Sequence, residues 1–199
     1  MSDLFVSKEL VARLINAQLM AVREAGAVKR CHILPHIGHY DVAQHCYGAV
    51  SLLLLLHKEP SHNLIQAVLW HDVAERWLGD LPATAKWDHR LLGRVYEVAE
   101  TEILRGLGLN VELTAEEAAW LKTVDLLELW LWSREQRSMG NGATHKLEKT
   151  CEDALDGLKV SGTMPEICAV LYDYLRPRTH ARLSDMFDEV VDGLKKVGA

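Results

Sequence analysis

Apolar residues recur at helical spacing along most of the 199-residue chain, and no segment of useful length alternates apolar and polar side chains. We therefore expect an all-α protein, a compact bundle of about seven helices. The pattern places five of these helices at about 7–24, 41–57, 63–78, 82–106 and 114–139, and two more from about 163 and 183.

Residues that favour helix ends support these boundaries. Asp41, Asn63 and Thr114 each precede a glutamine or glutamate by three residues, which is the spacing of a capping box. Gly26 and Gly79 follow the last periodic residues of two helices, where glycine is the usual terminator. The segment 27–40 does not fit a helix, because it mixes basic residues and histidines with a proline and a glycine. Long polar loops inside a compact domain are often functional.

Composition and charge narrow the class of protein. A content of 49% hydrophobic and 25% charged residues is typical of a soluble globular protein, and we expect residues 1–199 to form a single domain. The four cysteines form no CxxC pair, so we expect a cytoplasmic protein without disulfides or a zinc ribbon. The longest apolar run, 49–56, is too short to span a membrane. A formal net charge of −6 disfavours stable nucleic-acid binding but permits a small phosphorylated ligand.

His71 and Asp72 are adjacent, and an imidazole beside a carboxylate offers two ligands for a divalent metal ion. His45, on the preceding predicted helix, and Asp125, on a later one, could complete the set. Asp125 stands among leucines and a valine, where a carboxylate is costly unless it is paired or bound to metal.

Each of these residues also has an ordinary explanation. His45 could be a core or capping histidine, the His71-Asp72 pair could arise by chance, and Asp125 could pair with Lys122 or Arg134. The order of one histidine, a His-Asp pair and one aspartate, each on an apolar helix, favours a shared metal site.

Acidic residues near the predicted ligands could take part in catalysis. Glu75 lies four residues after His71, on the same helix face, and could orient the attacking water or carry its proton. Its ordinary role would be a solvated ion pair. Asp80 is either a helix N-cap or a catalytic carboxylate, and the two roles are compatible.

Basic residues surround the same segment. Lys86 and Lys122 could each direct an ammonium group at a phosphate, and Arg30 could do so through a bidentate fork. Any one of them could equally be a surface charge.

These residues together resemble the HD-domain 5'-deoxynucleotidases. The similarity covers about 27–135, and its most specific part is the pattern HDxxExxxGDxP that begins at His71 and ends at Pro82. Arg30, His45, Lys86 and the run from Lys122 to Asp125 also match. The sequence is similar as well to the related phage enzymes that hydrolyse dATP to deoxyadenosine and triphosphate.

The resemblance implies an HD-domain helical bundle, with its metal-site core at about 27–135 and C-terminal helices packed on that core. It also implies a deoxynucleotide substrate and a homo-oligomer. One divalent ion (Co, Mn, Zn or Mg) would bind at the four predicted ligands, and a second could arrive with the substrate phosphate. The metal ligands would be His45, His71, Asp72 and Asp125. The phosphate would be bound by Arg30, Lys86 and Lys122. Glu75 and Asp80 would be the acidic residues near the attacking water and the substrate.

One position departs from the family. The residue after the loop arginine is commonly a tryptophan that packs against the sugar, whereas here it is Cys31. Strict selection for 2'-deoxyribose therefore does not carry over. His32 and Ile33 are candidates to shape the base pocket.

Three functions remain open from the sequence. A deoxynucleoside monophosphatase would release deoxynucleoside and phosphate by attack of a metal-activated water on phosphorus. A triphosphohydrolase would need further cations for the outer phosphates, and a non-catalytic nucleotide sensor would be expected to lose Glu75, Asp80, Lys86 and Arg30, which are all present. The candidate further cations are Lys29, Arg76, His36 and His39.

Trp130, Leu131 and Trp132 are consecutive in the longest predicted helix and cannot all face one core stripe. Either one of them lies at a subunit contact, or the helix is buried on all sides.

Overall fold

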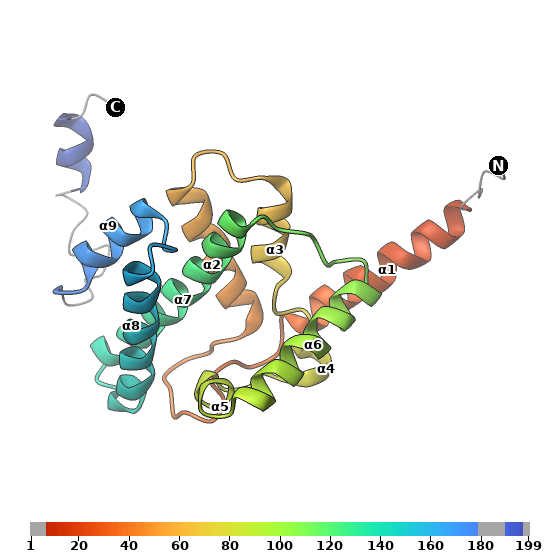
Figure 1. The fold of residues 1–199 in the computed structure, drawn as a ribbon, viewed down its shortest axis with the longest axis horizontal. Helices are drawn as coiled ribbons and strands as arrows, with labels where there is room; N and C mark the ends of the chain where they lie inside the picture. The colour runs from red at the N-terminus through yellow and green to blue at the C-terminus, as the bar shows by residue number, and fades with distance from the viewer. Residues whose placement is uncertain (1–6, 179–189, 197–199) are drawn as a thin grey trace.

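The computed structural model describes residues 7–178 and 190–196, and within these ranges the chain forms helices and no strand (Figure 1). The predicted all-α class is confirmed. The helices are α1 (Lys8–Ala25), α2 (Val42–Leu56), α3 (His62–Trp70), α4 (Glu75–Leu78), α5 (Ala83–Asp88), α6 (Arg90–Gly106), α7 (Ala115–Ser138), the 3-10 turn η1 (Gly142–Thr144), α8 (His145–Val160) and α9 (Glu166–Leu175).

Helix α7 is the central element, because α2 and α3 pack on one part of it and α8 and α9 on another (Figure 1). Trp130 and Trp132 are both buried within the chain, and Leu131 is half-buried against the same core. Of the two explanations for these residues, the buried helix is therefore the correct one, and the tryptophans are not needed for a subunit contact.

Helix starts follow local capping chemistry. Thr114 and Glu117 form the predicted capping box at the start of α7, and the Asp41 carboxylate accepts a hydrogen bond from the Gln44 N–H at 2.9 Å. The prediction for α3 was wrong by two residues: Ser61, not Asn63, caps it, through its hydroxyl and the N–H of Leu64.

Two predicted helices are each divided in the structure. The helix expected over 63–78 becomes α3 and α4, joined by tight turns over 71–74. The helix expected over 82–106 breaks at His89, whose φ of −126° and ψ of 78° lie outside the helical region. The hydrophobic period continues across both breaks, so periodicity alone could not place them. Helix α8 was not expected as a separate element. Of the helix expected from 183, residues 190–196 are helical and the preceding part lies outside the described residues.

The segment 27–40 is irregular, as expected, and is fastened at both ends. The N–H of Arg30 donates to the carbonyl of Tyr40 at 3.0 Å, which closes the loop on itself. The Gln136 side chain, on α7, bonds both the N–H and the carbonyl of Ile37. The loop therefore has a defined path beside α7.

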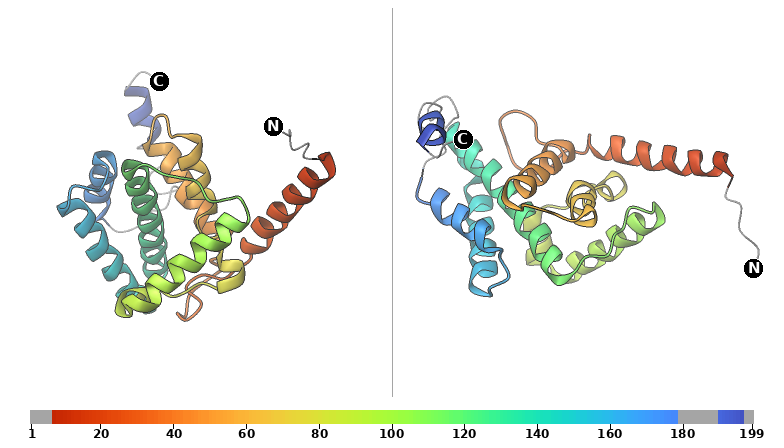
Figure 2. Two further views of the ribbon diagram at one scale, coloured as in Figure 1. Left: turned by 45° about the vertical axis from the view of Figure 1, so that its right-hand side comes forward. Right: turned by 90° about the horizontal axis from the view of Figure 1, so that it is seen from above.

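Helix α1 extends away from the other helices, and only its last turn packs on them (Figure 2). Ala21 and Ala25 are buried there, and the Gln18 amide donates to the carbonyl of Leu107 at 2.8 Å. Leu14 and Ile15, farther out, are each at least half exposed. No helix in the described ranges has both the length and the apolar character needed to cross a membrane.

Candidate metal centre

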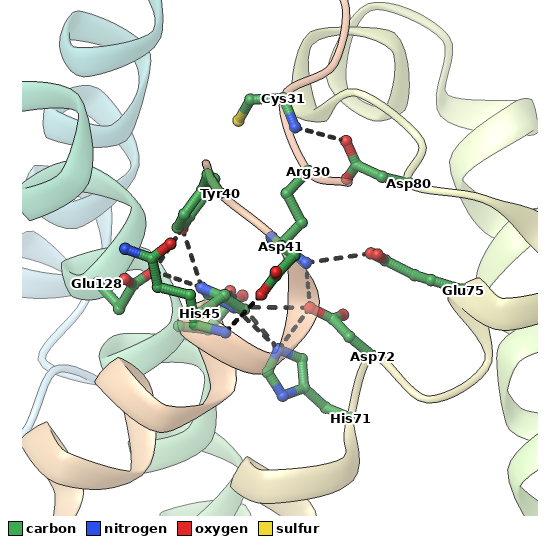
Figure 3. Close-up of polar contacts among 12 residues, drawn as sticks. Arg30, Cys31, Tyr40, Asp41, His45, His71, Asp72, Glu75, Asp80 and Glu128 are labelled. Carbon is green, nitrogen blue, oxygen red and sulfur yellow. Dashed lines mark hydrogen bonds and ion pairs between the residues drawn. The ribbon is translucent and has the colours of Figure 1, made fainter. Parts of the chain in front are cut away.

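Three helical elements bring the four predicted metal ligands together. His45 lies in the first turn of α2, His71 and Asp72 lie in the turn between α3 and α4, and Asp125 lies on α7. Helix α3 ends at Trp70, so His71 and Asp72 lie in the turn that follows it and not on one continuous helix. In this turn both side chains point toward His45 (Figure 3).

The ligand atoms are close enough to share one ion. Nε2 of His45 lies 3.3 Å from Nε2 of His71, 3.5 Å from Oδ2 of Asp72 and 3.2 Å from Oδ1 of Asp125. His45, His71 and Asp72 have ligand atoms that all lie within 4.8 Å of one another. Oδ1 of Asp125 is also 3.8 Å from Nε2 of His71. Two imidazoles and two carboxylates thus converge, a donor set that several divalent ions accept.

Electrostatics in this cluster favour a cation. Burial by itself would raise the pKa of Asp72, but Arg30 and His71 hold that pKa below its ordinary value. Burial would also raise the pKa of Asp125, but Lys122 and His45 hold that pKa below its ordinary value. Both carboxylates are therefore ionised, Asp72 in a buried position and Asp125 in a half-buried one, and the ionised form is the one that binds metal.

Glu75 lies beside the predicted ligands but is not one of the converging atoms. Burial and the charge of Asp72 raise its pKa to about 9, against the opposing effect of Arg30. The guanidinium of Arg30 bonds the carboxylate of Asp72 and Oε1 of Glu75, the latter at 3.1 Å (Figure 3). Oε2 of Glu75 and Nε of Arg30 are buried and find no hydrogen-bond partner in the described part of the chain. Both groups keep unused bonding capacity next to the metal site.

Asp80 takes a different structural role from the expected helix cap. Helix α5 has no side-chain cap, and the Asp80 carboxylate instead accepts a hydrogen bond from the Cys31 N–H at 2.8 Å. The N-cap interpretation was therefore wrong, while a role near the substrate is not tested. Burial and Asp80 together raise the pKa of the Cys31 thiol to about 12, so Cys31 is an unreactive packing residue at neutral pH.

Two cavities meet at the predicted ligands. The first, of about 250 Å³, is lined by the predicted ligands Asp72 and Asp125, by other charged side chains and by apolar ones. Its other charged side chains are Arg30, Glu75, Asp80, Lys86, Lys122 and Lys146. Its apolar wall includes Ile33, Leu34, Leu81, Leu126, Leu129 and Leu147. The second, of about 620 Å³, is lined by polar and charged residues, chiefly from α6.

Lys86 and Lys122 each line both cavities. Lys86 is partly engaged, because its ammonium lies 3.4 Å from a Glu100 carboxylate oxygen and over the ring of Tyr96. Lys122 lies 3.6 Å from Asp125 and is half exposed. Together with Ile33 and Cys31, these residues occupy the places that the sequence predicted for a substrate.

Other predicted residues lie elsewhere. The four cations considered for outer phosphates, Lys29, Arg76, His36 and His39, are not among the residues that line either cavity. Arg76 pairs with Glu24 on α1, and the His36 ring packs against Trp132. The second cavity is lined instead by Arg90 and Arg94, which the sequence did not single out. Two basic residues one turn apart on an amphipathic helix look like an ordinary solvated face.

Glu128 and Tyr40 were also missed. Both side chains are buried and contact Nδ1 of His45, the ring atom that faces away from the other ligands (Figure 3). A signal was present in the sequence, because Glu128 follows Asp125 by three residues on an otherwise apolar helix.

Two solved structures share this fold. An HD-domain phosphohydrolase from Listeria innocua superposes with a TM-score of 0.64 at 18% identity, over 90% of this chain and 99% of that one. The PH0347 protein from Pyrococcus horikoshii OT3 superposes with a TM-score of 0.60 at 17% identity, over 81% of this chain and 96% of that one. No family model matches the sequence, and no curated protein matches it. At these identities the likeness establishes a shared helical fold, in agreement with the expected HD-domain architecture.

Proposed function

We propose that this protein is a divalent-metal-dependent phosphohydrolase that converts a deoxynucleoside 5'-monophosphate to deoxynucleoside and inorganic phosphate. The observation that carries the proposal is the convergence of His45, His71, Asp72 and Asp125, of which the two aspartates line a cavity with a partly apolar wall. A cavity that combines an apolar wall with charged groups suits a ligand with a ring system and a phosphate. The sequence resemblance supports a deoxynucleotide as that ligand.

A divalent ion bound by the four ligands would lower the pKa of a water molecule and polarise a phosphoryl oxygen. The donor set supports this, since both carboxylates are ionised and both histidines direct Nε2 inward. Co, Mn, Zn and Mg all remain candidates, because a mixed nitrogen and oxygen set does not select among them.

Three cations of the chain would bind the phosphate. Arg30 presents a guanidinium that is held in place by Asp72 and Glu75, and its buried Nε has a hydrogen still to donate. Lys86 and Lys122 approach the same point from α5 and α7. These groups would neutralise the charge that develops on the equatorial oxygens during in-line attack.

Glu75 would manage the proton of the attacking water. Its side chain faces the metal site, and Oε2 has no hydrogen-bond partner in the part of the chain that the structure describes. The pKa of about 9 keeps Glu75 protonated at neutral pH, but the charge of a nearby divalent ion would lower that pKa, and the carboxylate could then accept a proton from water and pass it to the leaving oxygen.

The test is a product panel with purified full-length protein and each candidate metal. Deoxynucleoside monophosphates should release phosphate, and Glu75→Gln should lower kcat by about 100-fold, the usual size of a general acid-base contribution. Glu116→Gln, an exposed carboxylate on α7, is the matched control and should be fully active.

Metal and nucleotide binding without release of any product would contradict the proposal and favour a sensor. Activity of Glu75→Gln equal to that of the control would remove Glu75 from the mechanism.

A triphosphate substrate is the second candidate, and the second cavity favours it. Attack at the α-phosphorus is the same step for both substrates, but a triphosphate needs space and positive charge beyond the metal, on the side away from the nucleoside. The second cavity borders the predicted ligands, and its lining adds the cations Arg90 and Arg94, with the carboxylates of Glu97 and Glu100 beside them. In the product panel, release of inorganic triphosphate from a dNTP would identify this activity.

A further inference from the structure

Glu128 is a buried carboxylate on α7, between Leu127 and Leu129, and the proposed reaction does not use it. Burial of a carboxylate among leucines is unfavourable unless donors satisfy its oxygens. The groups that donate hydrogen bonds to Glu128 therefore indicate its role.

Two donors meet one oxygen of Glu128. Oε2 accepts a hydrogen bond from the Tyr40 hydroxyl at 2.5 Å and another from Nδ1 of His45. The Tyr40 hydroxyl also lies 3.1 Å from the same Nδ1, so the three groups form a closed set (Figure 3). Tyr40 is fixed by its ring, which stacks on Trp132 at 4.3 Å between centroids.

These contacts determine which ring nitrogen of His45 has a lone pair available for a metal ion. An ionised carboxylate only accepts hydrogen bonds, so Nδ1 of His45 carries the hydrogen and a neutral ring then has its lone pair on Nε2. Nε2 is the atom that faces His71 and Asp125. A bond from the outer nitrogen to a carboxylate is the arrangement that orients histidine ligands in metal sites.

Gly48 makes room for this carboxylate. It follows His45 by three residues on α2, and a Cβ at Gly48 would lie 2.7 Å from Cγ and 2.9 Å from Oε1 of Glu128. A larger residue at Gly48 would force the Glu128 side chain to shift.

The second histidine is held differently. Nδ1 of His71 lies 2.9 Å from the backbone carbonyl of Val68, so its orientation depends on the main chain of α3. His45, in contrast, has two side chains at its outer nitrogen, so their contribution is measurable by substitution.

We propose that Glu128 and Tyr40 are positioning residues that hold His45 with Nε2 directed at the divalent ion. This role rests on the proposed metal-dependent function. Neither residue contacts the ion or the substrate; both act through the imidazole. Loss of such a partner typically weakens metal affinity by about 10- to 100-fold.

The experiment is a Co²⁺ titration of the full-length protein, followed by visible absorption and by calorimetry. Glu128→Gln should weaken Co²⁺ binding by about 10- to 100-fold and alter the cobalt spectrum, because the imidazole ligand changes its orientation. Tyr40→Phe keeps the stacked ring and should show a smaller loss in the same direction. Glu148→Gln is the matched control, since Glu148 is a buried carboxylate that pairs with Arg137, away from the site.

A folded Glu128→Gln variant with the affinity and spectrum of Glu148→Gln would overturn the proposal. If Glu128→Gln does not fold, Tyr40→Phe decides: unchanged Co²⁺ affinity overturns the positioning role, and weakened affinity supports it. The titration contains no substrate, so a protein without phosphatase activity can still satisfy it. A wild-type chain that binds no divalent ion would overturn the metal centre and the positioning role together.

Discussion

Arg30 depends for its position on a backbone conformation that side chains rarely adopt. The next residue, Cys31, has φ of 51°, in the left-handed region, and is the one non-glycine with positive φ among the described residues. The Cys31 N–H donates to the Asp80 carboxylate, which compensates for the strain and fixes the start of the loop. Asp80 thereby connects the segment after α4 to the arginine that would bind phosphate.

Removing this anchor should weaken phosphate binding. Asp80→Ala deletes a charge-assisted hydrogen bond, whose loss costs about 1.5–3 kcal/mol, and we expect KM for the nucleotide to rise by about tenfold or more. Metal affinity should stay near the wild-type value, since Asp80 is not one of the converging ligands. Steady-state kinetics and Co²⁺ titration measure the two effects.

His32→Ala is the control for this experiment. The His32 ring lies 3.5 Å from the Asp80 carboxylate but is about half exposed, so its loss should change KM little. A KM for Asp80→Ala equal to that of His32→Ala would show that Asp80 does not hold Arg30 in place.

For individual residues, type and spacing in the sequence were enough to predict which side chains come together at the candidate site. The convergence of the four candidate ligands could be predicted, because histidines and aspartates on apolar helices are costly unless they are paired or bound to metal. Glu128 has the same property and could have been predicted in the same way. The contact of Asp80 with Cys31 could not, because it joins residues 49 positions apart through the path of an irregular loop.

Helix α6 shows what an element adds to the site. Gly93 and Tyr96 are its buried residues, and most of its length is exposed. Its first turns nevertheless border the second cavity, which is lined by Arg90 and Arg94 and also by Glu97 and Glu100. If phosphates beyond the first were bound there, α6 would supply both the cations and the carboxylates around them.

If the substrate is a triphosphate, Arg90 and Arg94 should contribute to activity on a dNTP but not to activity on a monophosphate. The double change Arg90→Gln and Arg94→Gln should lower kcat/KM for a dNTP by about 10- to 100-fold, because two charge-assisted contacts to the outer phosphates are lost. Activity on a monophosphate should be unaffected, and Arg105→Gln, near the other end of α6, is the control. Equal losses on both substrates, or none on the triphosphate, would contradict a role in binding the outer phosphates.

The elements themselves were predictable where their signals are local. The capping box of α7 and the glycine stop at Gly79 are encoded within a few residues, and the structure confirms both. The break between α3 and α4 is not encoded in this way, because the apolar period passes through it. Tertiary contacts fix the turn, since Asp72 and Glu75 are both held by Arg30 from the distant loop.

The whole molecule is arranged around α7, with one metal ligand on it and the others on the elements packed against it. The predicted ligands are 26 residues apart from His45 to His71 (71 − 45) and 53 apart from Asp72 to Asp125 (125 − 72). A metal ion would therefore connect α2, α7 and the α3–α4 turn directly. Helix α1 stands outside this arrangement, and the expected homo-oligomer stays a prediction.

The most direct test of the central claim is phosphate release from a deoxynucleoside monophosphate before and after removal of metal. Chelator-treated protein should release no phosphate, and one equivalent of Mn²⁺ or Co²⁺ per chain should restore the activity. The same addition to His71→Ala should restore nothing. Phosphate release that survives metal removal, or full recovery of His71→Ala, would contradict the account.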